Sequence, residues 1–344
     1  MERILVVRVG RAGDMVMITP ALRAILEKHA EAEVHLLTSP DGRRVLRGFD
    51  PRVTHTSIYE RHGLSGVLQR RRLKRELAGG GYTRVYCFET NPSYHVLLKG
   101  LPAEQFILAP AVEPVPFPQR CVALVTQPPP PAQWVWLPLT DTGRAAARAM
   151  VAAAGIHDGD FVVGLHPSFS ALGKPAFRAR DAHRRKTWPL ASFAQVALLL
   201  ADYGARQGLR LRVICDLLAE ERALGRELVE LSRGVVTLFT EPPDFERYKA
   251  TLARMNVLIT PDTGPMHVAA ALGTPLVALF SGRDPRDCGP YTDPARYIVL
   301  RSEETEQPEL GLAALSSDVV FAAAAMFFPD QYGQRETLPA PQIA

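Results

Sequence analysis

The stretch "LITPDTGPMHVAAALGTPLVALF", residues 258–280, decides the fold. Its apolar start predicts a buried strand that ends at Thr260, and "PLVALF" at its end predicts a second strand. Between them, Gly264 lies at a helix start and Pro265 suits the first helical position, where a missing N–H costs nothing. The stretch therefore predicts two strands joined by a helix, with the loop from Pro261 to Gly264 at the carboxyl edge of a parallel sheet.

This loop has the features of an anion site. The first N–H groups of a helix lack partners within the helix, and the helix dipole places about +0.5 charge at that end. The loop therefore suits a phosphate. A plainer alternative is that Asp262 and Thr263 only cap the helix. His267, one turn into the helix, either donates to a phosphate or packs beneath the loop.

The same alternation of strand and helix runs along the rest of the chain. Strands are expected at "RILVVRV", "VHLLT" and "YTRVYCF", and a helix over "MVMITPALRAILEKHA". The pattern restarts after a proline-rich interval with "FVVGLHP", "LRVICD" and "GVVTLF". Four consecutive prolines continue neither a helix nor a central strand, so the boundary is expected between "TQPPPPAQ" (126–133) and "GIHDGD" (155–160), and we place it near residue 157. Two α/β domains are predicted, 1–157 and 158–330, followed by a disordered tail over 331–344.

Composition narrows the class of protein. With 344 residues and 47% hydrophobic content, the chain is long enough to form two domains with buried cores. Its four cysteines lie far apart and form no CxxC, which argues against a structural zinc site or a disulfide framework and fits a reducing cytoplasm. We expect neither a signal peptide nor a membrane-spanning helix, because no run of about 18 apolar residues occurs. The net charge of +4 is too small to indicate nucleic acid.

A second loop, "VRVGRAGDMV" at residues 7–16, joins the first strand to the first helix. Gly10 and Gly13 permit a tight turn, but their spacing does not match the GxGxxG dinucleotide fingerprint. Asp14 stands at the helix start, where a carboxylate is either a helix cap or a catalytic group. The residues of this loop alone leave both interpretations open.

Taken together, several motifs resemble glycosyltransferase family 9, the lipopolysaccharide heptosyltransferases. They are "RVGRAGDMVMITPALRAI", "LHPS", "KTWP" and "TPDTGPMHVAAALGTPLVALFSGRDPRDCGPY", in the family's order and spacing along nearly the whole chain. The resemblance implies a GT-B architecture, in which two Rossmann-like domains with parallel sheets face a central cleft. In that architecture the first domain binds the acceptor and the second binds the nucleotide sugar.

The resemblance also implies a chemical role for particular residues. Asp14 takes the position of the general base that removes the acceptor proton in an inverting transfer. Asp262 takes the position that binds hydroxyls of the donor sugar. The leaving diphosphate needs fixed positive groups, and the candidates are Lys186 and the groups around Thr263, Gly264 and His267. Charge-assisted hydrogen bonds contribute about 1.5–3 kcal/mol each, so a few can replace a metal ion. Family members work without a metal, and we expect neither metal nor cofactor besides the ADP-sugar.

Other candidates complete the two binding sites. On the donor side, Ser168 follows a strand, and either Glu220 or Glu221 is expected to bind the ribose. On the acceptor side, Arg8 is expected to position the acceptor or to pair with the base, and Gly13 belongs to the same loop. These assignments predict two sites on two domains.

Three segments depart from the family pattern or imitate another motif. Residues 158–160, Asp-Gly-Asp, resemble a metal-binding DxD motif, but Asp and Gly are also ordinary turn residues, and we interpret them as a turn. "FSGRDP" replaces "FGPTDP" and places Ser281, Gly282 and Arg283 beside the donor site. Residues 169–185 resemble an insertion, either a flap over the nucleotide or a segment disordered without donor. The donor sugar is therefore left open.

The segment 61–75, "RHGLSGVLQRRRLKR", gathers basic residues on an expected helix. One interpretation is a solvated helical face. Another is that Arg71 and Arg72 bind anionic groups of a lipid-linked acceptor at the inner membrane surface.

These patterns predict an inverting, metal-independent glycosyltransferase that moves a heptose or related sugar from ADP to a hydroxyl of a lipopolysaccharide-type glycan. Its expected partners are a nucleotide-sugar donor and a lipid-linked or oligosaccharide acceptor, and its expected location is the cytoplasm, including the inner face of the membrane. Two alternatives stay open: a GT-B sugar-nucleotide epimerase, in which Asp14 has no obvious task, and a catalytically silent nucleotide-sugar-binding protein.

Overall fold

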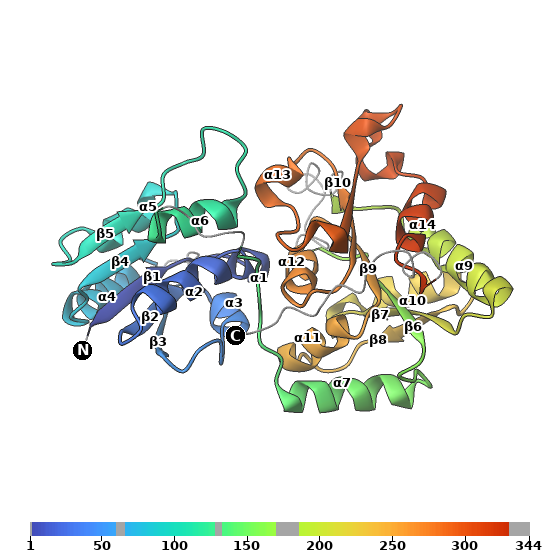
Figure 1. Ribbon diagram of the computed structural model, residues 1–344, viewed down its shortest axis with the longest axis horizontal. Helices are drawn as coiled ribbons and strands as arrows, with labels where there is room; N and C mark the ends of the chain where they lie inside the picture. Colours follow the sequence, from blue (N-terminus) through green and yellow to red (C-terminus); the bar gives the residue numbers. More distant parts are fainter. Residues whose placement is uncertain (1, 60–65, 128–132, 170–185, 330–344) are drawn as a thin grey trace. The chain divides into compact units, whose positions relative to one another are not determined.

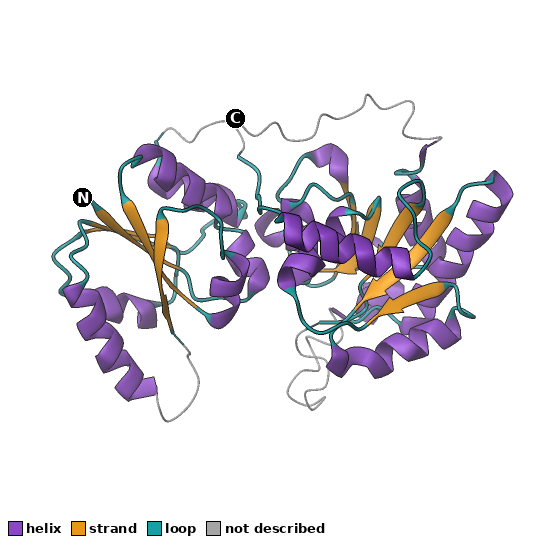
Figure 2. Cartoon of the chain, turned by 90° about the horizontal axis from the view of Figure 1, so that it is seen from below, coloured by secondary structure: helices purple, strands orange, loops and turns teal. Residues whose placement is uncertain are grey.

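The computed structural model describes residues 2–59, 66–127, 133–169 and 186–329. It divides the chain into two compact units, Met1–Pro138 and Leu139–Ala344. Each unit contains one parallel β-sheet, and helices pack on both sides of each sheet (Figures 1 and 2). Of the insertion expected over 169–185, all but Phe169 lies outside the described residues, as does the tail expected over 331–344.

The first unit has a five-stranded sheet in the order β3-β2-β1-β4-β5. The strands are β1 (Arg3–Val7), β2 (Glu33–Thr38), β3 (Val53–Ile58), β4 (Arg84–Cys87) and β5 (Glu104–Ile107). All neighbouring pairs are parallel. The strand order reverses at β1, so the carboxyl ends of β1 and β4 lie side by side at the topological switch point, where open α/β sheets bind ligands.

The helices of the first unit are α1 (Ala12–Val16), α2 (Thr19–Lys28), α3 (Pro40–Val45), α4 (Gly66–Gly79), α5 (Pro92–Leu98) and α6 (Phe117–Val125). The single helix expected over 15–30 is thus interrupted: α1 ends and α2 begins at Thr19, with Pro20 in its first turn. The proline has no N–H to continue the hydrogen bonds of α1, but it is well suited to the start of α2.

The second unit has a six-stranded sheet in the order β11-β10-β9-β6-β7-β8, again parallel throughout. Its strands are β6 (Phe161–Leu165), β7 (Leu211–Asp216), β8 (Val236–Phe239), β9 (Val257–Pro261), β10 (Leu276–Phe280) and β11 (Tyr297–Arg301). Every residue of β6, β9 and β10 is buried, as expected for central strands covered on both faces. The stretch 258–280 supplies two of these three strands and the helix between them.

The helices of the second unit are α7 (Asp141–Ala153), α9 (Leu190–Gln207), α10 (Arg222–Leu231), α11 (Phe245–Ala253), α12 (Gly264–Ala271), α13 (Pro285–Cys288) and α14 (Ser317–Ala325). Short 3₁₀ turns lie at η1 (Ala219–Glu221), η2 (Pro294–Arg296), η3 (Ser302–Glu304) and η4 (Pro308–Ala314). Helix α12 begins with Gly264, and Pro265 is its second residue, one position later than expected.

The division between the units falls after Pro138, before the position near 157 expected from the sequence. The difference arises because α7 packs on α11 of the second unit. Thr140 caps α7 by accepting from the Gly143 N–H, and Gly143 brings the two helices close. A Cβ atom at Gly143 would lie 2.6 Å from the backbone oxygen of Glu246. Helix α7 therefore belongs to the domain that follows it.

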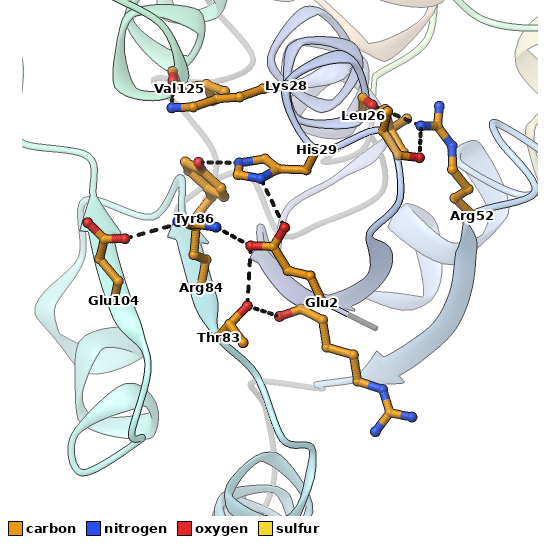
Figure 3. Close-up of polar contacts among 12 residues, drawn as sticks. Glu2, Leu26, Lys28, His29, Arg52, Thr83, Arg84, Tyr86, Glu104 and Val125 are labelled. Carbon is orange, nitrogen blue, oxygen red and sulfur yellow. Dashed lines mark hydrogen bonds and ion pairs between the residues drawn. The ribbon is translucent and has the colours of Figure 1, made fainter.

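A polar network joins residues at the amino ends of the strands of the first sheet (Figure 3). Glu2 accepts from Arg84, and Arg84 also donates to Glu104 at 3.2 Å. The two ring nitrogens of His29 lie 3.3 Å from Glu2 and 3.1 Å from the hydroxyl of Tyr86. Burial lowers the pKa of His29, so the ring is neutral near pH 7. These contacts tie β1, β4 and β5 to α2 on the edge opposite the switch point.

In the part of the chain that the structure describes, no single helix is long and apolar enough to cross a membrane. One bent pair, Pro308–Ala314 with Ser317–Ala325, meets the criteria by length and composition only.

Candidate functional site

The loop after β1 presents a carboxylate in a fixed position. Asp14 is the third residue of α1, and its two oxygens have separate donors. Arg8 donates from Nη2 to Oδ1 at 2.8 Å, and the backbone N–H of Arg11 donates to Oδ2 at 2.9 Å. The side chain of Asp14 remains 36% exposed. The carboxylate is therefore held at the carboxyl edge of the sheet and is still accessible to a ligand.

The two glycines of this loop act differently. A Cβ atom at Gly10 would lie 2.4 Å from the Cβ atom and 2.7 Å from Oδ2 of Asp14, so the glycine leaves room for the carboxylate. Gly13 is buried in α1, and its carbonyl accepts from the Met17 N–H at 3.1 Å. Ser39, which caps α3, donates to the carbonyl of Gly10 and fixes the loop from the neighbouring strand β2.

Glu89 belongs to the same group, although the sequence interpretation did not include it. It follows β4, and its Oε1 accepts from the Val9 N–H at 2.7 Å. Its Oε2 lies 3.6 Å from Nη1 of Arg8, and the side chain is 9% exposed. Arg8 also donates to the carbonyl of Phe88 at 3.1 Å and lies 4.6 Å from the ring centre of Phe117. A carboxylate directly after a buried strand adjacent to β1 was the signal that could have revealed Glu89.

Arg71 and Arg72, the other acceptor candidates, lie on the exposed face of α4. Among the described residues, no hydrogen bond or ion pair joins either of them to Asp14. Their neighbour Arg70 is also exposed, and its Nε donates to the hydroxyl of Tyr59 at 2.8 Å.

In the second unit, Lys186 and Asp262 form an ion pair after β9. Nζ of Lys186 donates to Oδ2 of Asp262 at 2.9 Å and also to its backbone carbonyl. The lysine side chain is 29% exposed and the aspartate side chain 12%. The pair therefore presents a partly exposed ammonium group beside the start of α12.

The start of α12 has no side-chain cap in the described contacts. Thr263 occupies the cap position, but its hydroxyl pairs with that of Thr260 at 3.1 Å instead of accepting from the helix. The Gly264 N–H is thus not capped by the Thr263 side chain, whereas Pro265 has no N–H and the Met266 N–H donates to the Thr263 carbonyl at 3.2 Å. His267 is buried one turn later. The capping interpretation of Asp262 and Thr263 is not what the structure shows.

Ser168 and Glu221 meet at the ends of neighbouring strands. Ser168 follows β6, and its hydroxyl donates to Oε1 of Glu221 in η1, after β7. The Leu218 N–H donates to Oε2 of the same carboxylate at 3.1 Å. Glu220, its neighbour, is exposed. Of the two glutamates between which the sequence left the choice open, Glu221 is the one that the structure brings together with Ser168.

The ends of β9, β6 and β7 are adjacent in the sheet, so these groups share one edge. His166, between β6 and Ser168, is partly buried, and its burial lowers its pKa to about 4 even though it hydrogen-bonds to the backbone of Ser168. Asp216 ends β7, and burial raises its pKa to about 6, despite Nη2 of Arg247 at 3.4 Å. No pattern in the sequence pointed to Arg247, which lies in α11.

The Asp-Gly-Asp segment is a turn at the opposite edge of this sheet, as predicted. Asp158 accepts from Arg254 at 2.8 Å. Asp160 lies 2.8 Å from Arg210 and 3.2 Å from Arg212, and it also accepts from the His157 N–H. Within the described ranges, no group of three or more His, Cys, Asp or Glu side chains is arranged to hold a metal ion.

The segment "SGR" after β10 is partly buried. Ser281 is buried, Arg283 is exposed, and the Gly282 N–H donates to Glu303. Gly282 has φ of 67°, in the left-handed region that favours glycine. This residue therefore shapes the turn, and Arg283 is the side chain of the segment that faces solvent.

Comparison with protein families finds a match within the second unit. The model of "Glycosyltransferase family 9 (heptosyltransferase)" matches residues 175–315. A lipopolysaccharide core heptosyltransferase of Haemophilus influenzae is 24% identical over 127 residues, which are 37% of this chain and 35% of that protein. Lipooligosaccharide heptosyltransferase 2 of the same organism is 31% identical over 119 residues, 33% of each chain. The chain thus matches about a third of the length of these relatives.

Solved structures show the same fold over nearly the whole chain. A family 9 glycosyl transferase of Veillonella parvula has a TM-score of 0.76 at 20% identity, covering 95% of this chain and 97% of that one. The ADP-heptose lipopolysaccharide heptosyltransferase II of Escherichia coli has a TM-score of 0.71 at 20% identity, with 95% and 98% covered. Another E. coli heptosyltransferase, solved with ADP, has a TM-score of 0.66 at 16% identity, with 95% and 100% covered. The predicted α/β class, the two Rossmann-like domains of the GT-B fold and the resemblance to family 9 are confirmed.

Proposed function

We propose that this relative of glycosyltransferase family 9 is an inverting, metal-independent glycosyltransferase that moves a heptose from an ADP-sugar to a hydroxyl of a lipopolysaccharide core or similar glycan. The observation that supports it most is the Lys186–Asp262 pair beside the uncapped start of α12, inside the segment 175–315 that matches the family. The names of the relatives supply the substrates, since both are heptosyltransferases of lipopolysaccharide or lipooligosaccharide.

The donor side has the groups that a leaving diphosphate requires. As the glycosidic bond breaks, its electron pair passes to the diphosphate oxygen, and fixed positive groups stabilise the new charge. Lys186 supplies an ammonium group, and the Gly264 N–H at the start of α12 supplies a further donor. Asp262 is itself anionic, but its contact with Lys186 offsets that charge beside a phosphate. The carboxylate then accepts hydrogen bonds from hydroxyls of the sugar.

The nucleoside part is assigned to the neighbouring strand ends. We place the ribose hydroxyls against Glu221, whose carboxylate is oriented by Ser168 and by the Leu218 N–H. An oriented carboxylate loses little conformational entropy on binding, whereas the exposed Glu220 would have to be ordered first. His267 is assigned to the diphosphate side of the same edge.

On the acceptor side, Asp14 is the proposed general base. The acceptor hydroxyl gives its proton to the carboxylate as its oxygen forms the bond to the anomeric carbon, on the face opposite the departing ADP. The two donors to Asp14 fix the direction of the carboxylate, and its 36% exposure leaves room for the acceptor. Arg8 and the loop through Gly13 form the floor of this site.

We propose that this chemistry needs no metal. The turn at residues 158–160 resembles a DxD motif, but both of its carboxylates pair with arginines. Asp158 pairs with Arg254, and Asp160 pairs with Arg210 and Arg212. Lys186 and the helix start would supply the positive charge that a divalent ion supplies in other glycosyltransferases.

For the partners, we propose a lipid-linked acceptor on the cytoplasmic side of the inner membrane. The exposed Arg71 and Arg72 of α4 are the groups proposed to bind its phosphates. A cluster of exposed arginines gains most from an anionic surface at low ionic strength.

The test is release of ADP from ADP-heptose with a truncated lipopolysaccharide acceptor in the presence of EDTA, comparing the parent with Asp14→Asn. Turnover by the parent, with loss of turnover but retained ADP binding in the variant, supports the proposal. A parent that binds ADP and releases none from the donor favours a silent binding protein. Loss of donor sugar configuration without any transfer favours an epimerase.

A further inference from the structure

We propose that Glu89 is a positioning residue for the transfer reaction: it holds Arg8 when Asp14 takes the acceptor proton. The inference rests on the proposed function of Asp14 and concerns a residue that the family resemblance did not suggest. A single guanidinium, that of Arg8, lies between two carboxylates. Its Nη2 is 2.8 Å from Oδ1 of Asp14, and its Nη1 is 3.6 Å from Oε2 of Glu89.

Arg8 is mostly shielded from water, since its side chain is 12% exposed. If Asp14 were its only anionic partner, protonation of Asp14 would leave a nearly buried guanidinium without a counter-charge. Breaking one side of such a pair is strongly unfavourable. Asp14 would then be a weaker base, because accepting the acceptor proton would carry this energetic cost. With Glu89 ionised, Arg8 keeps an anionic partner throughout the reaction.

Glu89 is itself fixed in place for this task. Its Oε1 accepts from the Val9 N–H at 2.7 Å, which joins the end of β4 to the loop after β1. The backbone carbonyl of Glu89 lies 2.8 Å from Nε2 of His95 in α5. The carboxylate therefore faces Arg8 from a stationary backbone. Unlike Asp14, which is 36% exposed, Glu89 is 9% exposed and too enclosed to be the group that meets the acceptor.

Several other ionisable groups near the cluster, among the described residues, are neutral or have other partners. Cys87 of β4 and Cys121 of α6 face it, and burial raises the pKa of both thiols, that of Cys87 to about 11, so both are neutral near pH 7. Arg120 of α6 directs its guanidinium to the carbonyl of Ala109. His95 contacts the backbone of Glu89 rather than its carboxylate. Among the described ion pairs, Arg8 is the cation that pairs with Asp14, and Glu89 is the second carboxylate beside Arg8.

The experiment measures kcat, the donor KM and the pH–rate profile of the full chain carrying Glu89→Gln. The amide keeps an oxygen for the Val9 N–H but removes the charge. We expect kcat to fall on the order of tenfold to a hundredfold, which is less than the loss expected when the general base itself is removed. We also expect the acid limb of the profile to move to lower pH by about one unit, because a negative charge is lost beside the Arg8–Asp14 pair. The donor KM should stay within about twofold, since the donor groups lie on the other unit.

Two further variants separate charge from folding. Glu89→Asp restores the charge with a shorter side chain and should recover most of the rate. Glu104→Gln removes a carboxylate of the same sheet that pairs with Arg84 at the opposite edge (Figure 3), and should leave kcat unchanged. A parent-like kcat and acid limb in Glu89→Gln, or equal rates in Glu89→Gln and Glu89→Asp, would overturn the inference while Asp14→Asn remains inactive. An active Asp14→Asn would instead overturn the proposed function, and the inference with it.

Discussion

Replacing Gly10 by alanine should displace the Asp14 carboxylate. In the structure a Cβ atom at Gly10 would lie 2.4 Å from the Cβ atom and 2.7 Å from Oδ2 of Asp14. Carbon atoms in contact are normally about 3.5–4.0 Å apart, so either the loop or Asp14 must move by about 1 Å. The Cβ atom of Asp14 is close to the helix backbone and cannot turn away as the end of a long side chain can.

The displacement should affect catalysis more than stability. A shift of about 1 Å in a reacting group costs about a hundredfold in rate, whereas a crowded methyl group costs about 1–3 kcal/mol of unfolding free energy. We therefore expect Gly10→Ala to lower kcat about a hundredfold while the chain remains folded. ADP release measures the rate, and urea unfolding measures the stability.

The matched control is Gly79→Ala, at the end of α4 in the same unit, where an added Cβ atom has nothing within 4 Å. This variant should retain parent activity. The reasoning would be refuted if Gly10→Ala turned over within about threefold of the parent.

Three further predictions concern the second unit. Glu221→Gln should weaken ADP binding about tenfold in calorimetry, since a hydrogen bond to a charged group contributes about 1.5–3 kcal/mol, and Glu220→Gln should change it less than twofold; equal effects would remove Glu221 from the ribose site. Because burial lowers the pKa of His166 to about 4, its neutral form stabilises the fold above pH 6.5, and this contribution is lost as pH falls from 6.5 to 4. Between pH 7 and pH 4, the unfolding free energy of the parent should therefore fall by up to about 3 kcal/mol more than that of His166→Gln. An identical pH dependence in the two proteins would contradict the argument from burial. A fragment of residues 139–344 should unfold cooperatively and bind ADP, whereas one of residues 158–344, which lacks α7, should be less stable; equal melting temperatures would place α7 outside this domain.

Periodicity was sufficient to predict most of the fold. The all-apolar runs that became β6, β9 and β10 are typical of parallel strands covered on both faces, and short loops with Gly, Pro and Asp marked their carboxyl ends. The domain boundary could not be located in this way. The sequence of α7 shows an amphipathic helix, but it does not say which neighbour the helix covers; that depends on its contact with α11 through Gly143.

Candidate site residues could be named from the sequence where a single residue follows the end of a single strand. Asp14 and Asp262 both follow strands, and the structure places both at carboxyl edges. Residues that act through a partner on another element were not predictable in the same way. Glu89 reaches the loop after β1 from β4, and Arg247 reaches Asp216 from α11. Such pairs depend on strand order and side-chain direction, which a single sequence does not specify.

The most direct test of the proposed transfer is the mass of the acceptor itself. A truncated lipopolysaccharide acceptor is incubated with ADP-heptose, EDTA and the parent chain, and in parallel with Asp14→Asn. We predict that the parent adds one heptose to the acceptor for each ADP released, and that Asp14→Asn adds none although it binds ADP. An acceptor of unchanged mass, with ADP released or not, would contradict the assignment of this chain as a heptosyltransferase.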